Sequence, residues 1–143
     1  MNRPTAQILL VEDNPGDVLL VTEALKGSGM RISLHVCRDG VEALDYLRHR
    51  AEEGQAELPD LVLLDLNMPR MSGHELLAEL KADHELSPIP VVVLSTSTSP
   101  ADIRRTYQLQ ANSYVNKPLD LEFFMQAVRD IATYWLNVSR LPC

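Results

Sequence analysis

Short apolar runs alternate with helical patterns along the chain. The runs cover residues 7–11, 32–36, 61–64, 90–94 and 113–115. Those at 61–64 and 90–94 are almost continuously apolar, as expected for strands that are buried on both faces. Residues 32–36 instead alternate between apolar and polar, which predicts a strand that is covered less completely on one side. The pattern therefore predicts five strands separated by helices.

Polar capping residues mark the start of each predicted helix. They are Asn14 before Pro15, Asp39 before Gly40, Ser72 with Glu75 in a capping box, Ser99 before Pro100, and Asp120. The first helix is expected to stop near residues 27–29, which include two glycines. The polar, aperiodic stretch at 49–59 is interpreted as a helix end and an exposed loop. The last helix carries apolar residues between 121 and 136 at a period close to 3.6.

The strict alternation of strand and helix predicts an α/β fold with a parallel sheet and helices on both faces. By analogy, five strands fit the flavodoxin-like order 2-1-3-4-5. The 143 residues suit one domain, and neither an internal repeat nor a linker divides them. We therefore expect a single domain over residues 1–143, with a core over about 6–136 and a C-terminal extension at 137–143.

Composition and charge narrow the function classes. The net charge of −7, without a Lys/Arg stripe, argues against nucleic-acid binding. No apolar run reaches the roughly 18 residues of a membrane span, and the apolar stretch near the N-terminus is too short for a secretory signal. A cytoplasmic location is expected, with Cys37 and Cys143 as reduced thiols. The four histidines lack metal-ligand spacing and are interpreted as surface or strand-face residues.

Chemically reactive side chains gather where the predicted strands end. Glu12 and Asp13 follow the first strand, Asp65 the third, Ser95 the fourth and Lys117 the fifth. Ligands bind beyond the carboxyl ends of the strands in open α/β sheets. Three carboxylates in one crevice repel one another, and a hard divalent cation such as Mg²⁺ relieves that repulsion. With a lysine and a hydroxyl beside them, they form a set suited to phosphoryl transfer.

Four motifs at these strand ends resemble the signature of response-regulator receiver domains. They are VEDN at 11–14, LLDLNMP at 63–69 with Gly73, LS at 94–95 and NKP at 116–118. The resemblance covers nearly the whole chain, and the spacing of the motifs matches as well. It implies a two-component signalling switch that accepts a phosphoryl group from a sensor histidine kinase. It also implies that the protein is not an enzyme, apart from its own Mg²⁺-dependent phosphorylation and dephosphorylation.

The resemblance implies a metal site around the phospho-acceptor, which would be Asp65. Asp13 would bind Mg²⁺ directly, and Glu12 would hold it largely through water. Asp65 itself and the backbone carbonyl of Asn67 would complete the protein ligands.

A second group of residues would respond to phosphorylation. By the same resemblance, Ser95 would bond the phosphoryl group and Lys117 would pair with it. Pro118 would follow a cis peptide bond that aims Lys117, and Tyr114 would move inward when Ser95 shifts. The face formed by the last two strands and the last two helices would then change its partner preference. No output domain is expected in the chain, so the output would come through contact or phosphate relay.

A finer similarity concerns the partners. The EDNPGD start, the polar segment at 48–60, VVVLSTS and the apolar C-terminus are similar to single-domain regulators paired with phytochrome-type histidine kinases. Apolar residues also extend beyond the helix turns that five strands require, namely Trp135, Leu136, Val138 and Leu141. They suggest a homodimer through the C-terminal half. The alternative is that this tail folds back onto its own domain.

Two other functions are open at this stage. A phosphatase of the haloacid-dehalogenase type also uses an aspartate nucleophile, Mg²⁺ and a lysine. That class requires a second aspartate two residues after the nucleophile, where this chain has Asn67. An unphosphorylated pseudo-receiver would be a pure interaction module, and the complete acidic set argues against it. For single residues, Asp13 could be only a helix cap and Tyr114 could simply pack.

Overall fold

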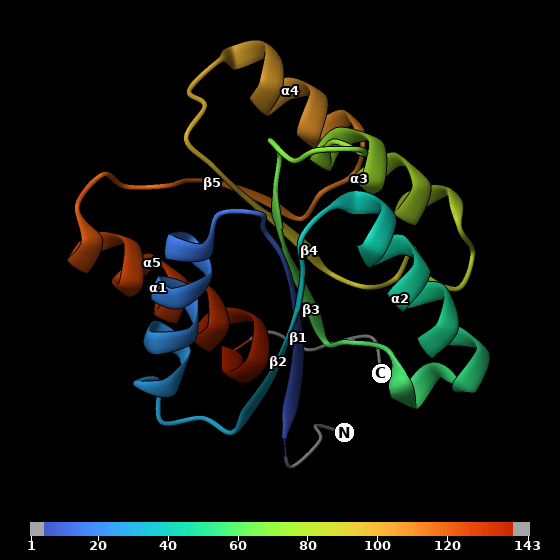
Figure 1. The fold of residues 1–143 in the computed structure, drawn as a ribbon, viewed down its shortest axis with the longest axis horizontal. Helices are drawn as coiled ribbons and strands as arrows, with labels where there is room; N and C mark the ends of the chain where they lie inside the picture. The colour runs from blue at the N-terminus through green and yellow to red at the C-terminus, as the bar shows by residue number, and fades with distance from the viewer. Residues whose placement is uncertain (1–4, 139–143) are drawn as a thin grey trace.

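The computed structural model describes residues 5–138 and contains one five-stranded parallel sheet in the order β2-β1-β3-β4-β5 (Figure 1). The strands are β1 (Ala6–Val11), β2 (Ile32–Cys37), β3 (Leu61–Asp65), β4 (Val91–Ser95) and β5 (Ser113–Asn116). The helices are α1 (Pro15–Lys26), α2 (Gly40–Glu53), α3 (Gly73–Ala82), α4 (Pro100–Gln108) and α5 (Leu121–Thr133). A short 3₁₀ helix (Gln55–Glu57) and a π-helical turn (Tyr134–Val138) complete the described elements. The predicted fold class and strand order are confirmed.

The sheet separates two hydrophobic cores. Helices α1 and α5 cover one face, and α2, α3 and α4 lie on the other (Figure 1). Along β1, Ile8 and Leu10 point into the α1–α5 core, whereas Leu9 and Val11 point into the opposite one. Successive strand residues face opposite sides, so a strand covered on both faces is apolar at every position. This explains the continuous apolar runs, since each fully buried aliphatic side chain contributes roughly 1.5–3 kcal/mol.

The predicted caps hold the five helix starts. In each case the cap side chain accepts a hydrogen bond from the third helical N–H, as Asp39 does from Glu42 at 2.9 Å. A cap of this kind is worth about 1 kcal/mol. Because every strand is followed along the chain by a helix, the caps also determine where the loops at that edge of the sheet end.

The stretch at 49–59 differs from the prediction. Helix α2 continues to Glu53, past the end that was predicted near His49. Good helix formers such as Arg50 and Ala51 carry it on, and Gly54 ends it with a φ of 123°. The following segment is not simply exposed, because Leu58 is buried in the α2–α3 core.

The predicted C-terminal tail is only partly described. Leu136 is buried and Trp135 packs against the same α1–α5 core, so these two side chains fold back onto their own domain. The side chain of Val138, together with Leu141 and Cys143, lies outside the described residues. The interpretation of these apolar residues as one exposed patch is therefore wrong for Leu136.

The predictions for the cysteines and for the histidines have different outcomes. Cys37 is a free, buried thiol, and burial raises its pKa to about 12, which makes it unreactive. His74 is not a surface residue, because it is buried between α3 and α4 and lies 3.0 Å from the hydroxyl of Thr106. Among residues 5–138, no helix is long and apolar enough to cross a bilayer.

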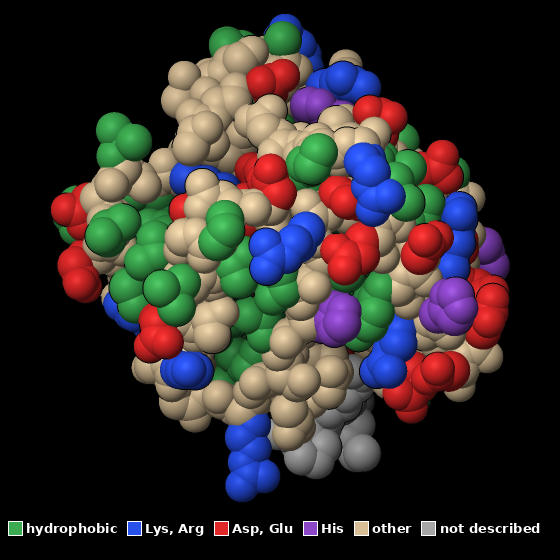
Figure 2. All heavy atoms as spheres, in the orientation of Figure 1, with side chains coloured by type: hydrophobic (Ala, Val, Ile, Leu, Met, Phe, Trp, Pro, Cys, Tyr) green, Lys and Arg blue, Asp and Glu red, His purple; other side chains and the backbone are tan. Residues whose placement is uncertain are grey.

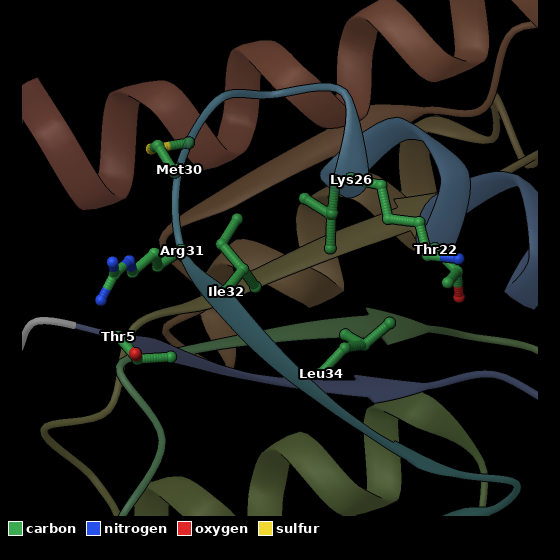
Figure 3. A pocket seen from close by; sticks show the side chains of 8 residues that line it. Thr5, Thr22, Lys26, Met30, Arg31, Ile32 and Leu34 are labelled. Carbon is green, nitrogen blue, oxygen red and sulfur yellow. The ribbon is translucent and has the colours of Figure 1, made fainter.

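Two surface features lie apart from the acidic strand ends. On the face in Figure 2, Lys and Arg are interspersed with Asp and Glu, and hydrophobic side chains gather over the α1 and α5 half. An open pocket of about 440 Å³ lies between the end of α1 and the start of β2 (Figure 3). Ile32, Leu34 and Thr5 are among its lining residues, and it contains no carboxylate. It lies at the amino end of the sheet, so it has no part in the acidic crevice.

Candidate functional site

Three carboxylates meet at the carboxyl end of the sheet. Strands β1 and β3 are neighbours with Val11 opposite Leu64, so the residues that follow, Glu12 and Asp65, lie side by side. Ligand oxygens of Glu12, Asp13 and Asp65 all lie within 4.8 Å of one another. Glu12 and Asp65 are buried, whereas Asp13 is exposed. The structure thus brings together the three acids that the strand-end argument predicted.

Lys117 reaches into this group from the end of β5. Its Nζ lies 2.6 Å from Oε1 of Glu12 and 3.4 Å from Oδ1 of Asp65. Asp17, in the first turn of α1 and outside that group of three acids, also contacts the Nζ of Lys117 at 2.9 Å. Burial lowers the pKa of Lys117, but its hydrogen bonds to Glu12 and Asp17 and the charge of Asp65 raise it overall. The ammonium therefore keeps its proton at neutral pH.

The surroundings of the two buried acids, Glu12 and Asp65, disfavour their charged forms. Burial raises the pKa of Glu12 and of Asp65, and the charge of a neighbouring carboxylate raises each further. Lys117 opposes both shifts without cancelling them. The donor set fits a hard divalent ion, because carboxylate oxygens are the ligands that Mg²⁺ and Mn²⁺ prefer. A bound divalent ion would stabilise the charged form of both acids and so oppose the rise in their pKa values.

Ser95 and Tyr114 both bind the backbone of one residue, Ser97. Ser95 ends β4, is fully buried, and its Oγ accepts a hydrogen bond from the N–H of Ser97 at 3.1 Å. The hydroxyl of partly buried Tyr114 donates to the carbonyl of Ser97 at 2.8 Å, and the Asn116 amide donates to it at 2.7 Å. A movement of Ser95 would therefore be transmitted to Tyr114 through the backbone at Ser97.

The peptide bond before Pro118 differs from the prediction. No peptide bond in the described range is cis, so Lys117–Pro118 is trans and the expectation of a cis bond is wrong. The trans form is the cheaper one by about 0.5–1 kcal/mol. Lys117 is aimed by other means, because its N–H donates to the carbonyl of Ser95 at 2.8 Å and carboxylates hold its Nζ.

Gly73 lets α3 approach the end of β3 closely. A Cβ added there would lie 2.5 Å from the carbonyl oxygen of Asp65 and 2.6 Å from Cα of Leu66. The N–H of Gly73 donates to the Leu66 carbonyl at 2.9 Å. Asn67 follows on this β3–α3 loop with an exposed side chain. The motif glycine thus has a steric reason, and the metal-binding role of the Asn67 carbonyl stays a prediction.

Sequence reasoning missed two contacts around the site. Asp17 is interpretable from the sequence only as an acid in a helical first turn, a common pattern that says nothing of a lysine one hundred residues away. Asp39 was identified as a cap, but its bidentate pair with Arg70 at 2.9 and 3.0 Å was not. Both contacts join residues far apart in the sequence, so no short motif in the sequence predicts either of them.

Known proteins resemble this chain over most of its length. Residues 8–129 match the family model of the response regulator receiver domain. The chain is 47% identical over 135 residues to the probable methanogenesis regulatory protein FilR2 of Methanothrix harundinacea, covering 94% of this chain and 86% of FilR2. It is 40% identical over 141 residues to the response regulator Rcp1 of Synechocystis sp., covering 99% of this chain and 96% of Rcp1.

Solved structures give the same result. The phosphorylated cyanobacterial phytochrome response regulator RcpA matches with a TM-score of 0.90 at 45% identity, covering 97% of this chain and 99% of RcpA. Rcp1 in its Mn²⁺-bound form matches with a TM-score of 0.88 at 40% identity, covering 96% of this chain and 99% of that one. The family match, the sheet order and the acidic strand ends agree. The protein is a two-component response regulator, and it belongs to the family of response regulator receiver domains.

Proposed function

We propose that Asp65 accepts a phosphoryl group and that Mg²⁺ is held by Glu12, Asp13, Asp65 and the backbone carbonyl of Asn67. One observation carries this proposal. A carboxylate oxygen of Asp65 lies within 4.8 Å of oxygens of Glu12 and Asp13, and Oδ1 of Asp65 lies 3.4 Å from the buried ammonium of Lys117. A buried acid in such a position is poorly explained by stability, because its charge is disfavoured there. It is well explained as a nucleophile that requires a metal.

The chemistry is a transfer from a phosphohistidine or from acetyl phosphate to an Asp65 oxygen. The new O–P bond forms as the P–N or P–O bond of the donor breaks, and the electron pair leaves with the imidazole or the acetate. Mg²⁺, when bound, neutralises charge on the phosphoryl oxygens. The Lys117 ammonium provides a fixed positive charge, and the Ser95 hydroxyl provides a donor for the acyl phosphate that results. Phosphorylation and dephosphorylation of the protein itself are the only reactions we propose.

The proposed switch follows from the two backbone contacts of Ser97. The phosphoryl group draws the Ser95 hydroxyl toward it, which frees the N–H of Ser97 and shifts the carbonyl that Tyr114 binds. Because Tyr114 lies on β5 and Ser97 on the β4–α4 loop, the β4–α4–β5–α5 face changes shape. Partner binding on that face is the proposed output.

A sensor histidine kinase of the phytochrome type is the proposed donor. RcpA is described as a phytochrome response regulator, and the match to it covers nearly both chains. A docking area is available beside the site, because Leu19, Leu119, Leu121 and Phe123 are exposed and a cleft of about 200 Å³ adjoins Lys117. A cytoplasmic location, a homodimer through the C-terminal half and no nucleic-acid partner complete the proposal. The net charge of −7 supports the last point.

Acetyl phosphate tests the acceptor directly. The wild type with Mg²⁺ is expected to gain one phosphoryl group by intact mass, and to lose this gain in EDTA. Asp65→Asn is expected to gain none, whereas Asp45→Asn, at an exposed acid of α2, is expected to behave as wild type. Equal labelling of the Asp65 variant, or no labelling of the folded wild type, would refute the acceptor assignment.

The partner proposals have their own measurements. A phytochrome-type kinase is expected to transfer phosphate to this protein faster than unrelated sensor kinases do in a time-course panel. Light scattering coupled to size exclusion is expected to give a dimer at tens of micromolar. A monomer at that concentration, with and without phosphorylation, would contradict the homodimer.

A further inference from the structure

Lys117 is held by a carboxylate outside the metal group. Its Nζ makes two short contacts, to Glu12 at 2.6 Å and to Asp17 at 2.9 Å, and a longer one to Asp65 at 3.4 Å. Only 8% of the Lys117 side chain is exposed, against 29% for Asp17. The ammonium therefore lies between the acid cluster and the first turn of α1.

Glu12 cannot serve two cations equally. It belongs to the three carboxylates that lie within 4.8 Å of one another, and Asp17 does not. A divalent ion in that group attracts the Glu12 oxygens and repels the ammonium beside them. The contact between Lys117 and Glu12 weakens when the ion enters, and Asp17 is then the anion that keeps Lys117 in the crevice.

Asp17 is well fixed for this task. It is the third residue of α1, after Pro15, and its N–H donates to the side chain of Asn14 at 3.1 Å. A negative charge in a helical first turn is stabilised by the unpaired N–H groups there. The carboxylate is therefore attached to a rigid helix end rather than to a loop.

We infer that Asp17 is a positioning residue, which holds the Lys117 ammonium within reach of Asp65 while Mg²⁺ occupies the carboxylates. This inference rests on the proposed function, since it assigns the lysine its place during transfer to Asp65. The inference predicts that the Lys117 ammonium is held mainly by Glu12 in the metal-free protein and by Asp17 in the metal-bound protein.

The side-chain ammonium of Lys117 is the direct readout. Its ¹H–¹⁵N signal, assigned by its loss in Lys117→Arg, is expected in the wild type with and without Mg²⁺. In Asp17→Asn it is expected to persist without Mg²⁺ and to vanish by solvent exchange when Mg²⁺ is added. Asp17→Glu keeps the charge and is expected to restore the signal. A merely structural role for Asp17 would not make the effect depend on Mg²⁺.

Acetyl phosphate provides the second readout. At saturating Mg²⁺, phosphorylation of Asp17→Asn is expected to slow by about tenfold, the size expected for one lost charge-assisted hydrogen bond. Asp17→Glu is expected to recover most of the rate. Glu122→Gln, which removes an exposed first-turn acid from α5, controls for the loss of helix-end charge and is expected to react as wild type.

The outcomes separate the two proposals. A wild-type rate in Asp17→Asn together with a persistent Mg²⁺-bound ammonium signal overturns the positioning role and leaves the acceptor assignment intact. Absence of labelling in the wild type overturns the acceptor assignment, whereas the ammonium signal still decides whether Asp17 holds Lys117. If Asp17→Asn is unfolded by circular dichroism, Asp17→Glu decides: its Mg²⁺-bound signal either persists, as the role requires, or is lost, which overturns it.

Discussion

The Nζ of Lys117 lies 2.6 Å from Oε1 of Glu12, and both side chains are buried. A divalent ion bound as proposed would therefore compete with the ammonium for the same carboxylate. We predict that Lys117→Met raises the Mg²⁺ affinity by about tenfold, because a nearby positive charge is removed and Glu12 is released. Isothermal titration calorimetry measures this change. Lys26→Met, at an exposed lysine on α1, is the control, and an affinity that stays the same or falls in Lys117→Met would contradict the competition.

The pair between Asp39 and Arg70 connects the start of α2 to the β3–α3 loop. Burial raises the pKa of Asp39, but hydrogen bonds from the Glu42 N–H and from Arg70 outweigh it and lower the pKa overall. Asp39→Ala is expected to lower the free energy of unfolding by about 1–3 kcal/mol, since it removes a cap and a bidentate partner. Arg70→Ala is expected to cost less, about 1 kcal/mol or below, because its side chain is 60% exposed. Urea denaturation measures both, and the reverse order would refute this account.

Gly73→Ala tests the close approach of α3 to the end of β3. The added methyl would overlap the backbone at Asp65 and Leu66, so α3 must shift, at a cost of about 1–3 kcal/mol. Because the shift moves the loop after Asp65, the Mg²⁺ affinity is expected to fall as well. Gly27→Ala is the matched control, since its Cβ would meet only atoms at 3.7 Å or more. Equal melting temperatures for the two variants would show that the steric argument is wrong.

His74 predicts a pH dependence of stability. The Thr106 hydroxyl donates to the Asp102 carbonyl at 2.8 Å, so the His74 Nε2–H must donate to Thr106. Burial, followed by the charge of Arg105, lowers the pKa of His74 from its usual 6.5. Between pH 6.5 and the lowered pKa, His74 therefore binds a proton in the unfolded chain but not in the folded one. The free energy of unfolding falls as the pH drops through this range.

We predict that His74→Gln loses this component of the pH dependence. The difference in unfolding free energy between wild type and variant, from urea denaturation at several pH values, should shrink as the pH falls from about 7.5 to 5.5. His84→Gln, at an exposed histidine, is expected to leave the wild-type profile unchanged. Parallel profiles for wild type and His74→Gln would exclude a role for His74 in the pH dependence.

The sheet and the acid cluster were predictable from the sequence for one physical reason. A parallel strand covered on both faces must be apolar throughout, so its end is marked by the first polar residue, as Asp65 marks the end of β3. Parallel strands deliver their ends to one edge, and this places Glu12, Asp13, Asp65 and Lys117 together without any knowledge of the loops.

The remaining features depend on contacts between distant elements. Whether His74 faces solvent depends on how α4 packs over α3, and a histidine at that helical position is equally suited to either surrounding. The partner of Asp17 depends on how far the Lys117 side chain reaches. The trans bond before Pro118 concerns a small energy difference that neighbouring residues do not encode.

The clustered carboxylates have a consequence for how this protein can evolve or be engineered. Glu12, Asp13 and Asp65 lie within 4.8 Å of one another, where like charges repel, so a substitution that neutralises one of them is expected to relieve that repulsion. Selection for expression or heat resistance alone would therefore be expected to remove one of these carboxylates first, while the hydrophobic cores improved. The site persists only where signalling itself is selected. A cluster of like charges that does not favour folding is therefore itself evidence of selection for function.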